Sequence, residues 1–329
     1  MYLIKKGEIK MDALLIMLKN VVLFVALAVP GYLLVKTKML TAQHSGVLSK
    51  LLMYVGMPFL ILSGTVNNIS FNKELIITIT VVAAIGIAFT FAMFFASKPI
   101  SVVESREKSK GMMRFCMTFS NNGFLGIPLA VAVFGASSPV MTVLVILNII
   151  TNILMYTLGI YLVSGDKSKI SLKKAFLNPV LVAFVIGVVL NLLKVNTYVP
   201  EISTFSAHFS GLVTPLSMTI LGMKMAEIKF SSLFKSWRMY YVCAMKLVAF
   251  PVVIVALLFA IKQLGASVID ANVILGFFIA FAMPTAGLAS TFADGFNGDT
   301  ENAVTMTLGT TVLSIISIPI LYWILCYLL

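Results

Sequence analysis

Ten stretches of mainly apolar residues, each about as long as a membrane-spanning helix, constrain this chain more than any other feature. A helix needs ~20 apolar residues to cross the hydrocarbon core of a bilayer. Only 11% of the residues are charged, whereas soluble domains carry about 25%, so an ordinary soluble fold is excluded. The stretches, called runs 1 to 10, are 13–36, 45–66, 75–96, 111–134, 139–163, 175–194, 203–223, 239–262, 270–293 and 302–328.

The segments between the runs are too short to form a domain outside the membrane. We therefore predict an all-α integral membrane protein with ten transmembrane helices. The predicted organisation is a polar N-terminal leader at 1–12, a first five-helix repeat at 13–163, a cytoplasmic linker at 164–174 and a second five-helix repeat at 175–329. Met1 and Met11 are both candidates for the true start.

Basic residues are unevenly divided between the two sets of loops. Of the 24 Lys and Arg residues, 16 lie in the loops after runs 1, 3, 5, 7 and 9, and six lie in the other loops and the N-terminal segment. The remaining two, Lys19 and Lys246, fall inside runs. Because loops rich in Lys and Arg stay in the cytoplasm, the first set is predicted to be cytoplasmic and both termini to lie outside. The net charge of +12 then indicates orientation rather than nucleic-acid binding.

Prolines recur at matched positions in the two halves of the chain. Pro58 and Pro128 are 70 residues apart, and Pro215 and Pro284 are 69 apart. A shift of 156 or 157 residues superposes the first pair on the second. The alternative is that proline is simply frequent in membrane helices.

The same shift brings Gly31 onto Gly187, so runs 1–5 and 6–10 resemble two copies of one unit. A unit with an odd number of spans must enter the membrane in opposite directions in its two copies. The sequence therefore predicts an inverted repeat, an arrangement typical of secondary transporters.

Run 4 contains residues that interrupt a helix in its middle. Asn121, Asn122, Gly123, Gly126 and Pro128 lie within eight positions of each other. Proline removes a backbone donor and disfavours helix at the preceding residue, and the glycines allow the chain to leave helical geometry. We expect a broken helix, with the amides beside the break.

Run 9 has a break at the equivalent place, at Pro284 followed by Thr285 and Gly287. Unwound backbone survives in a membrane only where protein or a wet cavity satisfies it. Two matched breaks are therefore expected to cross near the midplane, where the half-helix N-termini direct partial positive charge at a common site for an anion or carboxylate. The alternative is two ordinary proline kinks packed against neighbouring helices.

Other polar or helix-breaking residues are assigned to the surroundings of this crossing. Pro58 and Pro215 make milder breaks that support it. Asn148, Thr151 and Asn152 share one helix face, where amides either line a cavity or join helices; joining is favoured, and Asn148 is the better site candidate.

Lys246 is charged and lies within run 8. Placing a lysine at the bilayer centre is unfavourable by ~2.5–3.5 kcal/mol, which makes it a functional candidate. It is predicted either to support anion binding or to extend its ammonium group to the cytoplasmic face.

The motifs of the two breaks resemble those of the auxin efflux carrier family. The residues that carry the resemblance are Gly126-Ile-Pro128 with upstream Asn121, the mid-run Pro284, and Asn178-Pro179 at the start of the second half. That family includes plant auxin carriers and bacterial malate-permease-like proteins. The short basic join between the halves is more similar to the bacterial branch.

The resemblance covers nearly the whole chain and implies a fold, a substrate class and a partner. The fold has ten spans with helices 4 and 9 crossing, related to bile acid symporters and sodium/proton antiporters. The substrate is an organic anion whose carboxylate meets Asn121, and a scaffold forms a homodimer in many members. Small Thr285 and Ala286 after Pro284 depart from the larger polar residues of many plant members and argue against an aromatic substrate.

We therefore predict a secondary transporter of small organic anions, mono- or dicarboxylates, that works by alternating access in the bacterial cytoplasmic membrane. No metal or cofactor is predicted, and coupling to a proton or to a sodium gradient is left open. The alternatives are an intramembrane enzyme or receptor, or an ion channel. The chain lacks nucleotide-binding, hydrolase and zinc motifs, which disfavours a pump driven by ATP.

Overall fold

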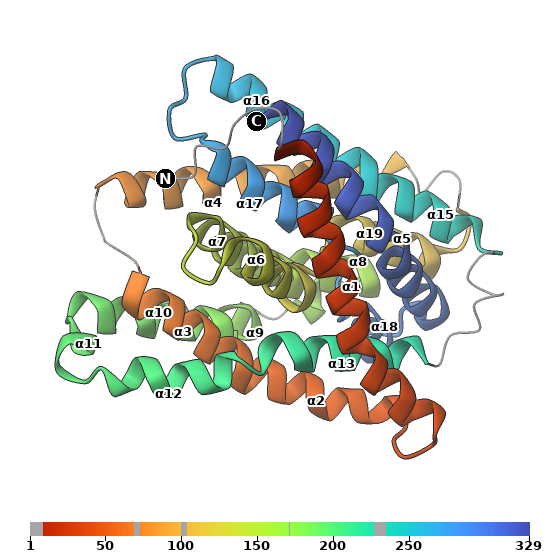
Figure 1. The fold of residues 1–329 in the computed structure, drawn as a ribbon. Helices are drawn as coiled ribbons and strands as arrows, with labels where there is room; N and C mark the ends of the chain where they lie inside the picture. The colour runs from red at the N-terminus through yellow and green to blue at the C-terminus, as the bar shows by residue number, and fades with distance from the viewer. Residues whose placement is uncertain (1–8, 69–72, 100–103, 171, 227–234) are drawn as a thin grey trace.

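Helices make up almost all of the computed structural model, which describes residues 9–68, 73–99, 104–170, 172–226 and 235–329 (Figure 1). Helix occurs in every one of the ten predicted runs, and the described residues contain no β-strand beyond an isolated bridge. The prediction of an all-α protein is confirmed for these residues.

The described helices are α1 (Ile9–Lys36), α2 (Ser45–Leu51), α3 (Met57–Asn68), α4 (Lys73–Ala96), α5 (Glu107–Thr118), α6 (Ile127–Phe134), α7 (Pro139–Leu154), α8 (Ile160–Ser164), α9 (Leu172–Phe176), α10 (Pro179–Leu192), α11 (Val195–Tyr198), α12 (Glu201–Ser210), α13 (Val213–Met225), α15 (Trp237–Cys243), α16 (Phe250–Gln263), α17 (Ala271–Ala282), α18 (Ala289–Gly295) and α19 (Thr300–Leu328).

Five described helical stretches are long and apolar enough to cross a membrane. They are Ser45–Val66, Lys73–Ala96, Pro139–Ser164, Trp237–Gln263 and Thr300–Leu328. Shorter apolar helices cover Val22–Lys36, Asn122–Phe134, Pro179–Leu192 and Ala271–Ala282.

Three prolines lie just after a turn of π-helix. The π-helical turns Leu52–Gly56, Asn122–Gly126 and Ala244–Ala249 end two residues before Pro58, Pro128 and Pro251. A proline inside a helix has no N–H and its ring clashes with the carbonyl four residues earlier. Widening the preceding turn accommodates that carbonyl, so the helix continues through each proline instead of ending there.

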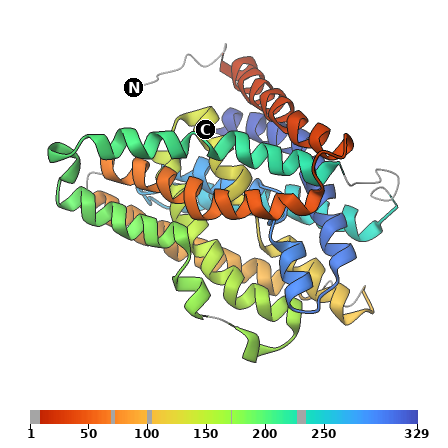
Figure 2. The same cartoon turned by 90° about the horizontal axis from the view of Figure 1, so that it is seen from below.

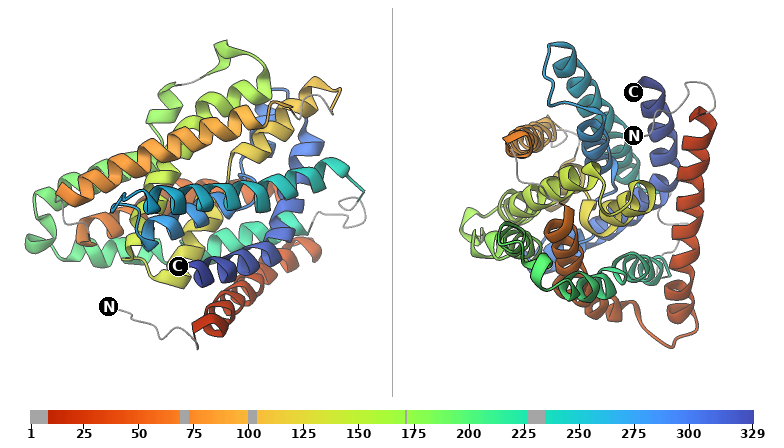
Figure 3. Two further views of the ribbon diagram at one scale, coloured as in Figure 1. Left: turned by 90° about the horizontal axis from the view of Figure 1, so that it is seen from above. Right: turned by 60° about the vertical axis from the view of Figure 1, so that its left-hand side comes forward.

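The helices form two groups, which we call the panel and the bundle. The panel comprises α1, α2, α3, α10, α12 and α13; α1 packs on α13, and α3 packs on α10 and α12. The bundle comprises α4 to α8 and α15 to α19, with α7 packed between α4 and α17. Figure 2 brings α2, α3, α12 and α13 of the panel to the front, and the right-hand view of Figure 3 shows α1 at the edge beside α19.

Glycines set the closest contacts in the panel. A Cβ atom on Gly31 of α1 would lie 2.0 Å from the carbonyl oxygen of Thr219, and one on Gly222 of α13 would lie 1.8 Å from that of Ala28. The two helices therefore touch backbone to backbone. Gly187 of α10 makes a similar approach, since its Cβ would lie 2.7 Å from the Thr65 Cβ of α3. Small residues permit such close packing between membrane helices.

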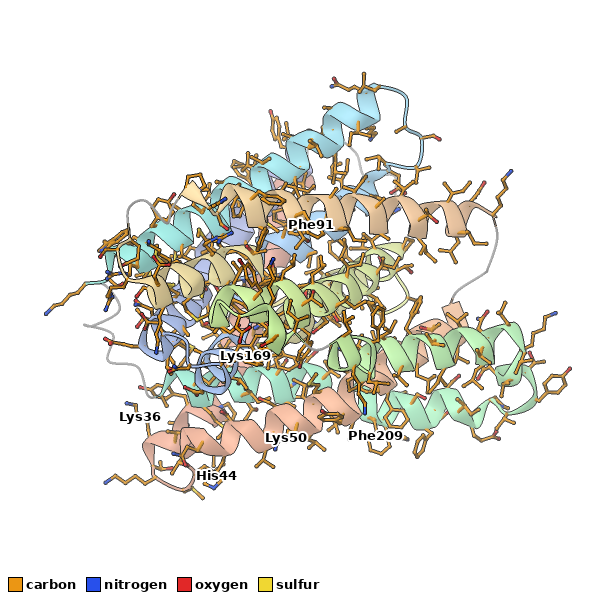
Figure 4. The ribbon with its side chains drawn as sticks, turned by 180° about the vertical axis from the view of Figure 1, so that it is seen from behind. Lys36, His44, Lys50, Phe91, Lys169 and Phe209 are labelled. Carbon is orange, nitrogen blue, oxygen red and sulfur yellow. The ribbon has the colours of Figure 1, made fainter. Side chains whose placement is uncertain are left out.

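The turn between α1 and α2 and the starts of α5 and α15 lie at one end of the molecule, and α11 and the start of α4 lie at the other (Figure 1). Lys36 and His44 mark that turn in Figure 4, with Lys50 further along α2. His44 closes the turn, because its Nδ1 accepts a hydrogen bond from the Thr41 backbone N–H at 3.0 Å.

Buried ionic contacts join the bundle helices at the same end. Glu104, 2% exposed, accepts a hydrogen bond from Arg238 at the start of α15. The Arg238 hydrogen bond lowers the pKa of Glu104 below its ordinary value, despite burial. Arg114 of α5 donates to the carbonyl of Phe94 at 3.0 Å and so caps the end of α4.

Two helices begin inside segments that the sequence places outside the apolar runs. Residues 1–8 of the leader predicted at 1–12 lie outside the described residues, and α1 already begins at Ile9. The linker predicted at 164–174 contains residue 171, which also lies outside them, and α9 begins within it at Leu172. Helix-forming residues on either side extend these helices beyond the purely apolar runs.

The glycine contact between α1 and α13 gives a stability prediction. Alanine in place of glycine favours a helix interior by ~1 kcal/mol, but at Gly222 the added carbon would overlap a backbone carbonyl. Overpacking of this kind costs ~1–3 kcal/mol. We expect Gly222→Ala to lower the melting temperature of the detergent-purified protein. Gly64→Ala is the control, because a Cβ at Gly64 of α3 meets nothing within 4 Å; equal melting of the two variants would contradict the contact.

Candidate functional site

The chain is extended between α5 and α6 and again between α17 and α18, and the two extended segments cross side by side. The Asn121 N–H donates to the Pro284 carbonyl at 2.7 Å, and the Ala286 N–H donates to the Phe119 carbonyl at 2.9 Å. These bonds form a single antiparallel bridge. Backbone groups exposed by each break are therefore satisfied by the other break, which lies more than 160 residues away in the chain.

Side chains satisfy further backbone and polar groups at this crossing. Thr285 is fully buried, and its hydroxyl donates to the Cys116 carbonyl at 2.9 Å. The Thr285 N–H in turn donates to the hydroxyl of Thr310 in α19 at 3.2 Å. Lys246 donates from its ammonium group to the Ser120 hydroxyl.

An amide network fixes the second half of the first broken helix against α7. Asn122 donates to the Thr151 hydroxyl at 3.0 Å and accepts from the Asn148 amide at 2.9 Å. Asn152 donates to the Asn148 carbonyl at 2.8 Å. The amide oxygen and nitrogen of Asn122 are thus both engaged within the protein. Asn148 and Thr151 therefore join α7 to this helix, as predicted, whereas Asn152 bonds only Asn148 of its own helix among the described residues.

Asn121 differs from its neighbour, because no side-chain hydrogen bond from it is found to any part of the chain that the structure describes. Its amide nitrogen lies against Gly287, where an added Cβ would be 3.5 Å away. Asn121 also precedes the first turn of a helix running from Asn122 to Phe134. The N–H groups of such a turn have no acceptor within their own helix.

Asn121 lines a small cavity of about 50 Å³ at the crossing. None of its described lining residues is acidic. The lining comes from both breaks and from the panel: Met53, Met57, Ser120, Asn121, Asn122, Gly123, Phe124, Asn148, Thr151, Asn152, Met155, Asn178, Val180, Ala286, Gly287 and Leu288.

A larger cavity of about 720 Å³ continues along the same helices. Along α7 the lining passes from Asn148 in the small cavity to Val145 and Met141 in the large one. Along α10 it passes from Val180 to Phe184. Since these are successive helical turns, the large cavity leads from the crossing toward the end of the molecule where α4, α7 and α17 begin.

The predicted site residues fall into two groups. Those that line the small cavity are Asn121, Asn122, Gly123, Asn148 and Gly287. Those that do not line it are Gly126, Pro128, Pro284, Thr285, Lys246, Pro58 and Pro215. Pro284 and Thr285 build the crossing itself, and Lys246 reaches it through Ser120.

The prediction for how the first helix breaks was wrong in detail. Ile127, expected to leave the helix before Pro128, is helical with φ −62° and ψ −50°. The glycines also lie in helical turns rather than at the unwound positions. Gly123 instead makes room for the Asn148 amide, 2.9 Å from where its Cβ would be, and Gly126 for Met283. Pairing with the second broken segment unwinds the chain several residues earlier than local propensity indicates.

A family described as membrane transport protein matches the chain twice, over residues 15–172 and 167–322. The chain belongs to this family. The resemblance to the auxin efflux carrier type is thereby confirmed. The two matched ranges meet at 167–172, near the middle of the chain.

One relative in the membrane transport protein family comes from Methanothermobacter thermautotrophicus and is named as an uncharacterized transporter. It is 27% identical over 207 residues, which cover 61% of this chain and 63% of the relative. The family match and the long apolar helices make the chain a multi-pass membrane protein of this family.

Two residues near the cavity were not among the predicted site residues of this membrane transport protein. Asn178 is 4% exposed, and its oxygen caps α10 by accepting from the Val180 N–H at 2.8 Å. Its buried amide nitrogen has no partner among the described residues. Lys224 donates to the Gly287 carbonyl at 3.4 Å. The Asn-Pro pair indicates a helix start, whereas nothing in the sequence indicates which cavity either residue approaches.

Thr285 allows a test of the crossing that does not depend on substrate. Thr285→Val keeps the shape but leaves the buried Cys116 carbonyl without its donor, at a cost of ~1–3 kcal/mol. We expect a lower melting temperature, which Thr285→Ser restores in large part. Thr80→Val is the matched control, because the Thr80 hydroxyl bonds only the Ile76 carbonyl of its own exposed helix. Equal losses in the Thr285 and Thr80 variants would contradict the described crossing.

Proposed function

We propose that this protein is a secondary transporter of small organic anions, mono- or dicarboxylates, which binds the substrate carboxylate at the crossing of the two broken helices. The observation that carries the proposal is the Asn121 amide, which faces the small cavity and has no side-chain partner among the described residues. An unpartnered donor in a largely buried site favours a ligand that accepts hydrogen bonds.

The charge around the cavity supports an anion. Its described lining contains amides, hydroxyls and apolar groups and no carboxylate. The first N–H groups of the helix that begins at Asn122 add partial positive charge. Lys246 places a basic amine behind Ser120, and the Asn178 amide nitrogen gives a second donor, from the panel, that has no partner among the described residues.

The sizes of the cavities support a small substrate. About 50 Å³ admits a carboxylate group and the atoms next to it. The remainder of the substrate would extend into the larger cavity, which includes Ser138 and Thr142. This arrangement supports aliphatic carboxylates rather than an aromatic acid held wholly at the crossing.

We further propose ten membrane spans arranged as two inverted repeats. The glycines that the repeat aligns, Gly31 and Gly187, occupy equivalent contacts on α13 and α3. A third cavity, of about 210 Å³, includes Pro284 in its lining. The α19 residues that line it have the same spacing as the residues of α7 and the following turn that line the small cavity. The first set is Thr311, Ser314, Ile315 and Ile318, and the second is Asn148, Thr151, Asn152 and Met155.

Alternating access in this arrangement is movement of the bundle relative to the panel, around the crossing. The small cavity is lined by residues of both groups, and the large cavity lies about one helical turn further along α7 and α10, toward one end of the molecule. We place the protein in the cytoplasmic membrane of a bacterium, with a homodimer formed through the panel. An enzyme or receptor is the alternative, and uptake of radiolabelled malate by proteoliposomes distinguishes transport from both.

Substitution of Asn121 tests the site directly. Asn121→Asp keeps the size but replaces donors by negative charge, so we expect carboxylate binding to be abolished. Asn121→Ala keeps the backbone donors, and loss of one bond to an ionised acceptor, worth ~1.5–3 kcal/mol, weakens Kd about ten- to a hundredfold. Thermal-shift titration of each purified variant with lactate, succinate and malate measures this.

The control for that titration is Asn196→Ala, because Asn196 lies in α11 and accepts only from Ser203. It should bind like the wild type. Unaltered affinity in Asn121→Asp would remove the carboxylate from the crossing and overturn the proposed site.

The proposed orientation has its own test. In a variant without native cysteines, Lys167→Cys and Lys235→Cys should react with an impermeant maleimide only after cells are permeabilised, whereas a tag after Leu329 should be accessible in intact cells. The reason is the excess of basic residues in one set of loops, which holds them in the cytoplasm. Labelling in the opposite sense would invert the assigned faces of the membrane.

A further inference from the structure

Lys246 is the feature that the proposed site does not fully explain. It is fully buried, in the π-helical turn Ala244–Ala249 in the middle of the long helix Trp237–Gln263. Its ammonium group does not extend to the surface. It donates instead to the Ser120 hydroxyl, in the extended segment that crosses the second break.

No carboxylate contacts Lys246 within the part of the chain that the structure describes. The segment that carries it packs against α5, α17 and α19. On α5, Cys116 is a buried free thiol, and Arg114 is turned to the Phe94 carbonyl. On its own helix, Cys243 lies one turn away.

The other two elements bring no acidic group to this position. Helix α17 has no titratable residue between Ala271 and Ala282. On α19, Glu301 and Tyr322 lie nine and twelve residues from Thr310, the residue that contacts the crossing, or ~13 and ~18 Å along the helix. Lys246 thus faces hydroxyls and thiols and no counter-ion.

An isolated ammonium in a dry interior is so unfavourable that such a group becomes neutral unless an opposite charge arrives. The substrate carboxylate proposed at Asn121 is such a charge. Ser120, the partner of Lys246, lines the same small cavity as Asn121. Anion and ammonium then stabilise each other.

We propose that Lys246 takes up one proton for each carboxylate that binds, which makes the protein a proton-coupled rather than a sodium-coupled transporter. The inference rests on the proposed function and names its coupling ion. When the anion binds, the neutral amine of Lys246 takes a proton from water and becomes ammonium. When the anion leaves, the same proton returns to water, so that one proton and one carboxylate charge cross together.

The experiment measures proton uptake by the purified protein in weakly buffered solution with a pH indicator. Malate is the probe, and binding is followed in parallel by thermal shift. Above about pH 7 small carboxylic acids are already ionised, so uptake comes from the protein. We expect about one proton per malate bound and, above the pH where the empty site loses its proton, a Kd that weakens about tenfold per pH unit.

Variants identify the side chain that takes up the proton. Lys246→Met should bind malate more weakly, with no proton uptake and no pH dependence. Lys246→Arg carries a permanent charge and should bind without uptake. Lys262→Met is the control, because Lys262 is an exposed lysine at the end of the same helix; it should match the wild type.

The outcomes separate this inference from the proposed function. Malate binding without proton uptake by the wild type would overturn proton coupling and leave the carboxylate site standing, with Lys246 as a fixed charge. Proton uptake that persists in Lys246→Met would also overturn it. If lactate, succinate and malate all fail to bind to the wild type, the proposed function fails and the inference fails with it.

Discussion

The structure depends on the need to hydrogen-bond every polar backbone group that a membrane interior surrounds. Each broken helix leaves carbonyls and N–H groups that no lipid can satisfy. Here the two breaks satisfy each other, through the bonds from Asn121 to Pro284 and from Ala286 to Phe119. Thr285 completes the pairing by donating to the Cys116 carbonyl. Neither break is stable in this form without the other, and their pairing fixes where the cavity lies.

The same constraint assigns different roles to two adjacent asparagines. Asn122 uses both ends of its amide within the protein, so it holds the half-helix against α7. Asn121 is turned toward Gly287 and retains a free amide at the cavity. In the proposed function, Asn122 positions the site and Asn121 binds the substrate. The hydrogen bonds of the two asparagines, and not their packing, distinguish their roles.

Much of the fold follows from local sequence, and the site follows only in part. Long apolar runs predicted where helices lie, and Pro284 predicted an interruption where one occurs. The role of Gly123 and Gly126 was misjudged, because both make room for side chains of distant elements rather than for unusual backbone angles. The free amide nitrogen of Asn178 was missed for the same reason. The roles of these glycines and of Asn178 depend on contacts between residues far apart in the chain, and such contacts cannot be read from a local sequence pattern.

Three methionines also line the small cavity. Met53 and Met57 belong to the panel, and Met155 belongs to a π-helical turn after α7. A thioether chain is flexible and polarisable, and it tolerates substitution better than a branched side chain. None of the three takes part in the hydrogen bonds that hold the crossing together. In the proposed function, exchange of these methionines would therefore change substrate preference while the hydrogen bonds that stabilise the two broken helices stay in place.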